Sequence, residues 1–448
     1  MEKRVPIVFV TGVGQTWTSL RGDDRHRWNL FARDPEVIFG ALPAAERGRL
    51  LRVLTQIVRF VTTGRHPVDQ TELRKALTTI LRFCVVDDDG ALPIHTDVHI
   101  YGARSFDELS RVHFYTGEET DDPSQSLLDR LLRDVPCRDF LQEFGAENMY
   151  CFNYSPFTDL YAAADRLHET LRAILQKRGQ NQAVLVPMSM GAAVTVAYLD
   201  AYYSPDGAVR ENFVQRIVSV VGAWDGSEGF ADLLQGSVCP QWNERIFGEL
   251  LPAQKIHPLL LRVLTGHPER VNALLRQLLD ALLDGILLRS SAFLALVPHA
   301  RWGDMYPYLF SDARFVQNTR LLTVQREADR FIRAQSNLRQ RMQDVHDKCG
   351  IGFSFVGGTG LRPGEDSSDF QFMRYLHCAD RTDTDGVLQI GSAMPFDREH
   401  PDSFVQAFIV FDRQMHEIGE NKQAMQYIFD LAAGKECNPP HFVAKADA

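Results

Sequence analysis

The sequence predicts an α/β fold in which a mostly parallel sheet is flanked by helices. Two short apolar runs, 6–10 and 352–356, each end in a glycine-rich turn, which is typical of buried parallel strands. Between 148 and 222, apolar strands alternate with helical patterns. This alternation indicates parallel strands joined by right-handed crossover helices.

The order of the predicted elements divides the chain into a core and two insertions. Beyond the two runs above, the patterns predict strands at 148–152, 183–186 and 216–222, and helices at 158–177, 190–199 and 421–433. We therefore assign residues 1–33, 145–228 and 346–448 to one α/β core. Residues 34–144 form a mainly helical insertion, and residues 229–345 form a helical cap or lid.

Both insertions show helical periodicity. In the first, one predicted face carries Leu50, Leu51, Leu54, Ile57, Val58 and Val61, and Asp69 or Thr71 could cap a second helix. In the cap, apolar residues recur at helical spacing over 271–287. Packing into a core is the simpler interpretation of that stretch, and transient contact of the cap with a membrane surface is the alternative.

Composition limits the class of protein. The 448 residues carry a formal net charge of -10, which provides no basic footprint for nucleic acid. The seven cysteines include no Cys-x-x-Cys pair, and no run of about 18 apolar residues occurs, so we expect neither a structural metal nor a spanning helix. With no secretory leader pattern at the N-terminus, we expect a cytoplasmic protein.

Ser189 lies where a catalytic nucleophile would be expected. It follows the apolar run 183–186 and precedes Gly191 at the start of a predicted helix. A sharp strand-to-helix turn lifts a serine hydroxyl clear of the sheet, and small neighbours let helix and strand approach closely. The first glycine of the usual Gly-x-Ser-x-Gly pattern is Pro187 here. This context predicts an α/β-hydrolase fold.

A serine nucleophile requires a base that is itself oriented by a carboxylate. In this fold the chain order is serine, then acid, then histidine. Asp385 lies in a turn after the late strand, and His416 lies before the last helix. Asp383 competes for the acid role, but Asp385 is preferred because a glycine and two apolar residues follow it. We expect Ser189, Asp385 and His416 to form a catalytic triad.

An oxyanion hole needs two backbone N–H donors. Met190, the residue after the nucleophile, is one expected donor, and Val13, in the glycine-rich turn after the first strand, is the other. That turn lacks both the Gly-x-Gly-x-x-Gly spacing and the lysine of a P-loop, so it does not indicate a nucleotide site. The predicted reaction requires no metal and no cofactor.

Five segments resemble the lecithin:cholesterol acyltransferase and phospholipid:diacylglycerol acyltransferase family of α/β-hydrolases. They are 10–17, 186–191, 221–227, 355–361 and 383–388, with Met188 standing where the family usually has histidine. The resemblance covers about 5–20 and 145–435. It implies a serine acyl-transfer enzyme in which Asp385 is the acid and His416 the general base.

These observations predict a serine hydrolase or acyltransferase that acts on a carboxylic ester, with a lipid-like or other apolar acyl substrate. Water as acceptor makes it a lipase or esterase, and an alcohol makes it an O-acyltransferase. A thioesterase or amidase on the same scaffold, and a binding protein without turnover, remain alternatives. The sequence does not indicate the acyl chain, the acceptor or the oligomeric state.

Overall fold

A computed structural model describes most of the chain. The ranges it describes are 4–13, 17–20, 23–29, 44–81, 84–92, 94–96, 102–114, 118–134, 137–203, 211–239, 241–245, 266–365, 370–437 and 441–445.

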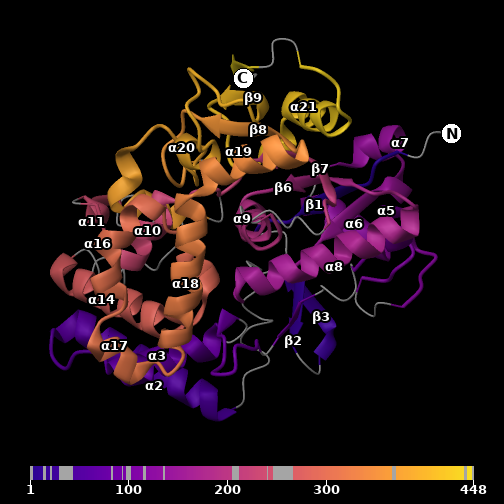
Figure 1. The fold of residues 1–448 in the computed structure, drawn as a ribbon. Helices are drawn as coiled ribbons and strands as arrows, with labels where there is room; N and C mark the ends of the chain where they lie inside the picture. The colour runs from indigo at the N-terminus through magenta and orange to yellow at the C-terminus, as the bar shows by residue number, and fades with distance from the viewer. Residues whose placement is uncertain are drawn as a thin grey trace.

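The centre of the molecule is a seven-stranded sheet in which every neighbouring pair is parallel (Figure 1). Its order is β10-β9-β8-β7-β6-β1-β5. The strands are β1 (Ile7–Val10), β5 (Met149–Phe152), β6 (Ala183–Pro187), β7 (Val214–Val220), β8 (Gly352–Thr359), β9 (Val405–Asp412) and β10 (His441–Lys445).

Helices cover both faces of this sheet. On one face, Val8 and Val10 of β1 pack in a core shared with α8 (Leu160–Arg178), α9 (Gly191–Tyr202) and α19 (Leu338–Cys349). On the other, Ile7 and Phe9 pack with α5 (Phe106–Leu109), α6 (Leu127–Asp134) and α21 (Lys422–Ala432). Burial on both faces explains why the strands have continuous apolar runs instead of alternating ones. The architecture is that of an α/β-hydrolase.

The sequence patterns missed two strands of this sheet. The eight residues of β9 are a nearly continuous apolar run, and β10 pairs alongside β9 as the edge strand. A run of this length is compatible with a strand or a buried helix, and pairing with β8 is what makes it a strand. The position of β9 in the sheet matters for the site, because the loop that follows β9 carries His416.

A second, helical unit lies beside the sheet (Figure 1). Helices α2 (Ala44–Thr63) and α3 (Gln70–Ile80), from the first insertion, pack against α14 (Pro268–Gly285) of the cap. Val53, Leu73 and Leu274 are among the buried residues of their shared core. The apolar face of α14 is therefore covered by α2 and α3. The other cap helices in the described part of the chain include α10 (Glu228–Gln235), α11 (Trp242–Arg245), α15 (Ser291–Leu294), α16 (His299–Leu309), α17 (Asp312–Gln317) and α18 (Leu321–Ser336).

Other described parts of the segment 34–144 lie away from the helical unit. Helices α5 and α6 pack on the sheet and not on α14. Strand β4 (Ile94–Thr96) pairs with β2 (Trp17–Leu20), which in turn pairs with β3 (Asp23–Asn29), and the three form a small antiparallel sheet. The segment therefore contributes to the helical unit, to this second sheet and to one layer of the main sheet.

The buried face of α2 differs from the face predicted from the sequence. Val53, Phe60 and Val61 are buried, whereas Leu51, Leu54 and Val58 are exposed, so the predicted face was partly wrong. Apolar residues lie on more than one side of this helix, and contact with α3 and α14 decides which side is covered. Of the two candidate caps, Asp69 caps α3, because its side chain accepts from the backbone N–H of Thr71 and Glu72.

The assignment of the α2–α3–α14 core can be tested with two leucines. Leu73 is 2% exposed and Leu54 is 56% exposed. We expect Leu73→Ala to lower the free energy of unfolding by about 2–5 kcal/mol, because it leaves a cavity in a packed core. The control Leu54→Ala should change it by less than about 0.5 kcal/mol. Urea denaturation measures both, and equal effects would contradict the assigned faces.

Candidate active site

Ser189 occupies the sharp turn between β6 and α9. Its φ of 49° is in the left-handed region, which non-glycine residues rarely adopt. The turn is fixed by two backbone hydrogen bonds, from Ser189 N–H to the Val220 carbonyl at 3.1 Å and from Ala223 N–H to the Ser189 carbonyl at 2.8 Å. A strained conformation held in this way by its surroundings is typical of functional positions.

Two glycines allow the turn to sit close to β1. A Cβ on Gly191 would lie 2.2 Å from the carbonyl oxygen of Val10, and a Cβ on Gly12 would lie 2.9 Å from the Cβ of Ser189. Larger residues would therefore push α9 or Ser189 away from the strand. The sequence pattern identified Gly191, but the contact of Gly12 with the serine is visible only in three dimensions.

Pro187 is accommodated without distortion of this turn. It is the last residue of β6, where it is opposite Val10 in the register with β1. The next residue, Met188, donates its N–H to the Val10 carbonyl at 3.0 Å. Ser189 N–H donates to the Val220 carbonyl on the other side, so pairing with both neighbouring strands continues past the proline. The side chain of Met188 is buried in the core on the α21 side of the sheet.

Ser189, His416 and Asp385 are joined by hydrogen bonds. The Oγ of Ser189 lies 2.9 Å from Nε2 of His416, and Nδ1 of His416 lies 2.8 Å from Oδ2 of Asp385. The residues are 31 and 227 positions apart in the chain. With Nδ1–H donating to the carboxylate, Nε2 is left to accept the serine proton. The structure thus brings together the three residues that the sequence predicted.

The two candidate acids have different partners. Asp385 is buried, and its Oδ1 accepts from the N–H groups of Val387 and Leu388 at 3.0 and 2.7 Å. These bonds aim its other oxygen at His416. Asp383 instead forms a bidentate ion pair with Arg381, at 3.0 and 2.9 Å. It is Asp385, and not Asp383, that contacts the histidine.

The protonation of His416 is controlled by two opposing effects. Burial disfavours the charged imidazolium, but the negative charge of Asp385 and the hydrogen bond to it outweigh burial. The pKa of His416 is therefore raised above its ordinary value of about 6.5. Such a histidine is a stronger base than free imidazole and holds a proton more firmly once it has taken it.

Each predicted oxyanion donor is next in sequence to a residue at the Ser189 turn. Met190 directly precedes the first residue of α9, where backbone N–H groups and the helix dipole favour negative charge. Val13 comes directly after Gly12, which contacts Ser189. Residues 14–16 of the same predicted turn lie outside the described residues. The donor roles of Met190 and Val13 remain predictions.

Aromatic side chains that the sequence analysis did not identify lie beside the histidine. The ring of Phe370 is 6.4 Å from that of His416, in an edge-on arrangement. The centre of the Phe370 ring also lies 6.4 Å from the ring centre of Phe230 in α10 and 6.3 Å from that of Phe372. Nothing in the local sequence marks these residues, because they come from two separate parts of the chain. They give the site an apolar border.

Neither a metal site nor a membrane-spanning helix is found in the described part of the chain. Within the described ranges, no group of three or more His, Cys, Asp or Glu side chains could hold a metal ion. The seven cysteines are all free thiols. In the same part of the chain, no helix has the length and apolar character needed to cross a membrane.

Comparison with known proteins gives no family. No protein-family model and no curated protein sequence matches the chain. Among solved structures, a chain of the Tle4–Tli4 complex matches with a TM-score of 0.39 and 12% identity, over 97% of this chain and 98% of that one. 2-Hydroxy-6-oxo-6-phenylhexa-2,4-dienoate hydrolase from Rhodococcus sp. strain RHA1 matches with a TM-score of 0.25 and 12% identity, over 67% and 84%. Likenesses this low do not bear on function, and membership of the acyltransferase family stays a prediction.

The opposing effects on His416 can be measured by following the imidazole resonance by NMR as pH changes. We expect a midpoint above about 6.5. In Asp385→Asn the charge is lost while burial remains, so the midpoint should fall. Asp383→Asn, which removes a carboxylate two residues away that contacts Arg381 instead, is the matched control and should leave the midpoint nearly unchanged. An equal downward shift in both variants would contradict the assignment of Asp385.

The close packing at the Ser189 turn predicts that substitution by alanine has opposite effects on stability at Gly191, which begins α9, and at Gly303, which lies within α16. Gly191→Ala should destabilise the protein by at least about 2 kcal/mol, because its Cβ would overlap the Val10 carbonyl. Gly303→Ala, inside α16, meets nothing within 4 Å and should stabilise it by about 0.5–1 kcal/mol. Thermal unfolding of both variants provides the comparison, and a neutral Gly191→Ala would contradict the proposed packing.

Proposed function

We propose that this protein is a serine hydrolase that cleaves carboxylic esters through an acyl-enzyme intermediate. The observation that supports the proposal most directly is the chain of hydrogen bonds from Ser189 through His416 to Asp385. An unactivated serine hydroxyl is a weak nucleophile, and this arrangement supplies both the base and the carboxylate that orients it.

In the proposed reaction Ser189 Oγ attacks the ester carbonyl while Nε2 of His416 takes the hydroxyl proton. Backbone N–H groups of Met190 and Val13 stabilise the oxyanion of the tetrahedral intermediate. His416 then gives the proton to the leaving alcohol, and an acyl-enzyme remains. Water, deprotonated by the same histidine, then attacks the acyl carbonyl. The bond from the acyl carbon to Ser189 Oγ breaks, His416 returns the proton to Oγ, and the acid is released. Throughout, the Asp385 carboxylate stabilises the imidazolium and stays ionised.

An apolar acyl group fits the border of the site. Phe370, Phe230 and Phe372 form a cluster of rings that reaches His416 through Phe370, and all three are partly exposed, so they offer ring surface to a hydrocarbon chain. Water is the proposed acceptor, because hydrolysis requires no second binding site. An alcohol acceptor would make the protein an acyltransferase, in keeping with the resemblance in its sequence. Product analysis in excess short-chain alcohol distinguishes the two.

The alternatives use the same scaffold. A thioesterase or amidase would share the triad and differ in leaving group, which a panel of esters, thioesters and amides would reveal. Met188 and the missing first glycine are the two departures that favour a binding protein without turnover. Since Met188 is buried in the core and Pro187 ends a strand, neither departure enters the hydrogen-bonded triad.

Reaction with a fluorophosphonate probe tests the proposal. The wild-type protein should gain one probe mass per chain, because only an activated serine attacks phosphorus at a useful rate. Ser189→Ala should gain none. Ser392→Ala, which removes another nearly buried serine hydroxyl that bonds to the Asp225 carbonyl instead of a histidine, should label like the wild type. Absence of labelling in the folded wild-type protein would overturn the proposed mechanism.

Ester turnover provides the kinetic counterpart. Ser189→Ala, His416→Ala and Asp385→Ala should each lower kcat by at least about 10³-fold, and the double variants should be no worse than the worst single one, because the three act as one unit. Asp383→Ala should retain most of the activity. Loss of activity in Asp383→Ala with retention in Asp385→Ala would reverse the assignment of the acid.

A further inference from the structure

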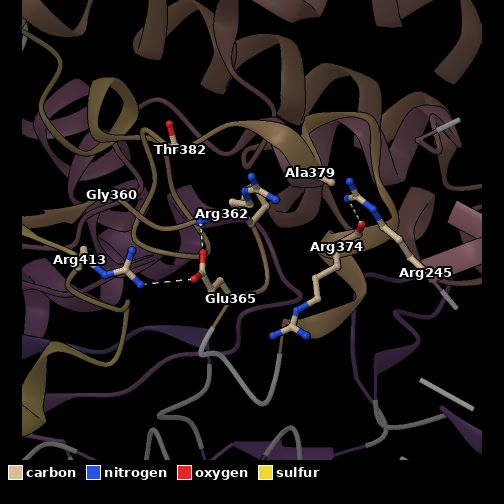
Figure 2. A pocket seen from close by; sticks show the side chains of 9 residues that line it. Arg245, Gly360, Arg362, Glu365, Arg374, Ala379, Thr382 and Arg413 are labelled. Atoms are coloured by element: carbon tan, nitrogen blue, oxygen red, sulfur yellow. Dashed lines mark hydrogen bonds and ion pairs between the residues drawn. The ribbon is translucent and has the colours of Figure 1, made fainter. Parts of the chain in front are cut away.

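A cleft of about 590 Å³ opens at the carboxyl end of the sheet, beside the loops that carry the triad acid and base. Gly360 directly follows β8 and Arg413 directly follows β9, so the cleft lies where these two strands end. It is lined by Arg245, Gly360, Arg362, Pro363, Glu365, Arg374, Ala379, Thr382 and Arg413 (Figure 2).

The described part of the lining is strongly basic. Of the lining residues that the structure describes, four are arginines and one is a glutamate, in a chain whose formal net charge is -10. Figure 2 shows the four guanidinium groups spread across the cleft, with Glu365 linked to Arg413 and to the backbone of Arg362. Clefts lined by one sign of charge concentrate ligands of the opposite sign. The ligand suited to this cleft is therefore an anion.

Two of these arginines are held in place by the fold. Arg245 donates to the carbonyl of Arg374 at 3.1 Å and to Asp380 at 2.7 Å. Nε of Arg374 donates to the carbonyl of Gly364 at 2.8 Å. A guanidinium group that is already oriented loses less entropy when it binds a ligand. Its planar fork also matches the geometry of phosphate and carboxylate groups.

The cleft is joined directly to the catalytic loop. Leu361 N–H donates to the Thr384 carbonyl at 2.9 Å, and the Thr384 hydroxyl donates to the Leu361 carbonyl at 2.8 Å. Gly364 N–H donates to the Gly386 carbonyl at 2.6 Å. These bonds lie on both sides of Asp385 in the sequence. A group bound in the cleft is thus next to the segment that positions the triad.

We propose that the arginine cleft binds an oxyanion group, a phosphate or a carboxylate, that is part of the ester substrate. This inference rests on the proposed function and specifies its substrate class. Phe370, whose ring contacts the apolar cluster near His416, is four residues before Arg374 of the cleft wall. The preferred substrate is therefore an amphiphilic ester with an apolar part along the phenylalanines and an anionic end at the arginines.

Two esters of equal length test this specificity, one neutral and one ending in a carboxylate or phosphate. The wild-type protein should show at least a 10-fold higher kcat/KM for the anionic ester. Arg362→Gln, at an exposed position, and Arg374→Gln should each reduce this preference at least 10-fold, mainly by raising KM for the anionic ester. The kcat/KM of each variant for the neutral ester should stay within about 2-fold of the wild-type value. The preference should also fall as salt rises, because salt screens exposed charges. Equal turnover of the two esters by the wild type, or an unchanged preference in both variants, would overturn the inference.

Arg381→Gln is the matched control. It removes one positive charge from the same loop, but Arg381 is paired with Asp383 and does not line the cleft. Any general effect of lost charge near the triad would appear in this variant for both esters. The preference for the anionic ester should be retained. If Arg381→Gln lowers the preference as much as Arg362→Gln, the cleft is not the source of specificity.

A binding measurement separates this inference from the proposed function. Calorimetry on Ser189→Ala, titrated with inorganic phosphate and with succinate, should detect binding that is weakened at least 10-fold by the added Arg362→Gln substitution. If no ester is hydrolysed and this Arg362-dependent binding persists, the proposed function fails and the anion site stands. If neither anion binds, the site is overturned. If free phosphate binds but anionic esters gain no advantage, the cleft takes a free anion and the substrate proposal is wrong.

Discussion

The close approach of α9 to β1 is the constraint on which the site depends. Because Gly191 has no side chain, the start of α9 can lie against the carbonyl of Val10. Because Gly12 has no side chain either, the turn that follows β1 can lie close to Ser189. The left-handed backbone of Ser189 follows from this geometry, since the chain must reverse between the end of β6 at Pro187 and the start of α9 at Gly191, within three residues. The turn thereby presents the serine hydroxyl at the carboxyl edge of the sheet.

The same edge collects the other two members of the triad. β8 and β9 are neighbours in a parallel sheet, so the loops that follow them begin at the same end. One loop carries Asp385, fixed by two backbone N–H groups, and the other carries His416. A buried carboxylate is costly unless it is fully hydrogen bonded. Here its bonds both meet that requirement and orient the histidine.

Positive charge and apolar surface lie in separate places around the site. An acidic chain places four arginines around one cleft beside the catalytic loops, while an aromatic cluster lies next to His416. These arginines come from α11, from the loop after β8, from the 3₁₀ turn at Gln371–Tyr375 and from the end of β9. An anionic amphiphile would satisfy both surfaces at once, with its charge and its hydrocarbon in separate places.

The sequence by itself determined the features that depend on neighbouring residues. An apolar strand, a serine and a small-residue helix start predicted the turn at Ser189, and the chain order of acid and base pointed to Asp385 and His416. What it could not determine depends on residues far apart in the chain. The local sequence favoured Asp385 over Asp383, but the contact of Asp385 with His416, 31 residues away, exists only in the folded chain. Likewise, the buried face of α2 is chosen by α3 and α14, β9 becomes a strand by pairing with β8, and the arginine cleft exists only where separate loops meet. Local periodicity reports which residues favour burial, whereas tertiary packing decides which of them are buried and which charges become neighbours.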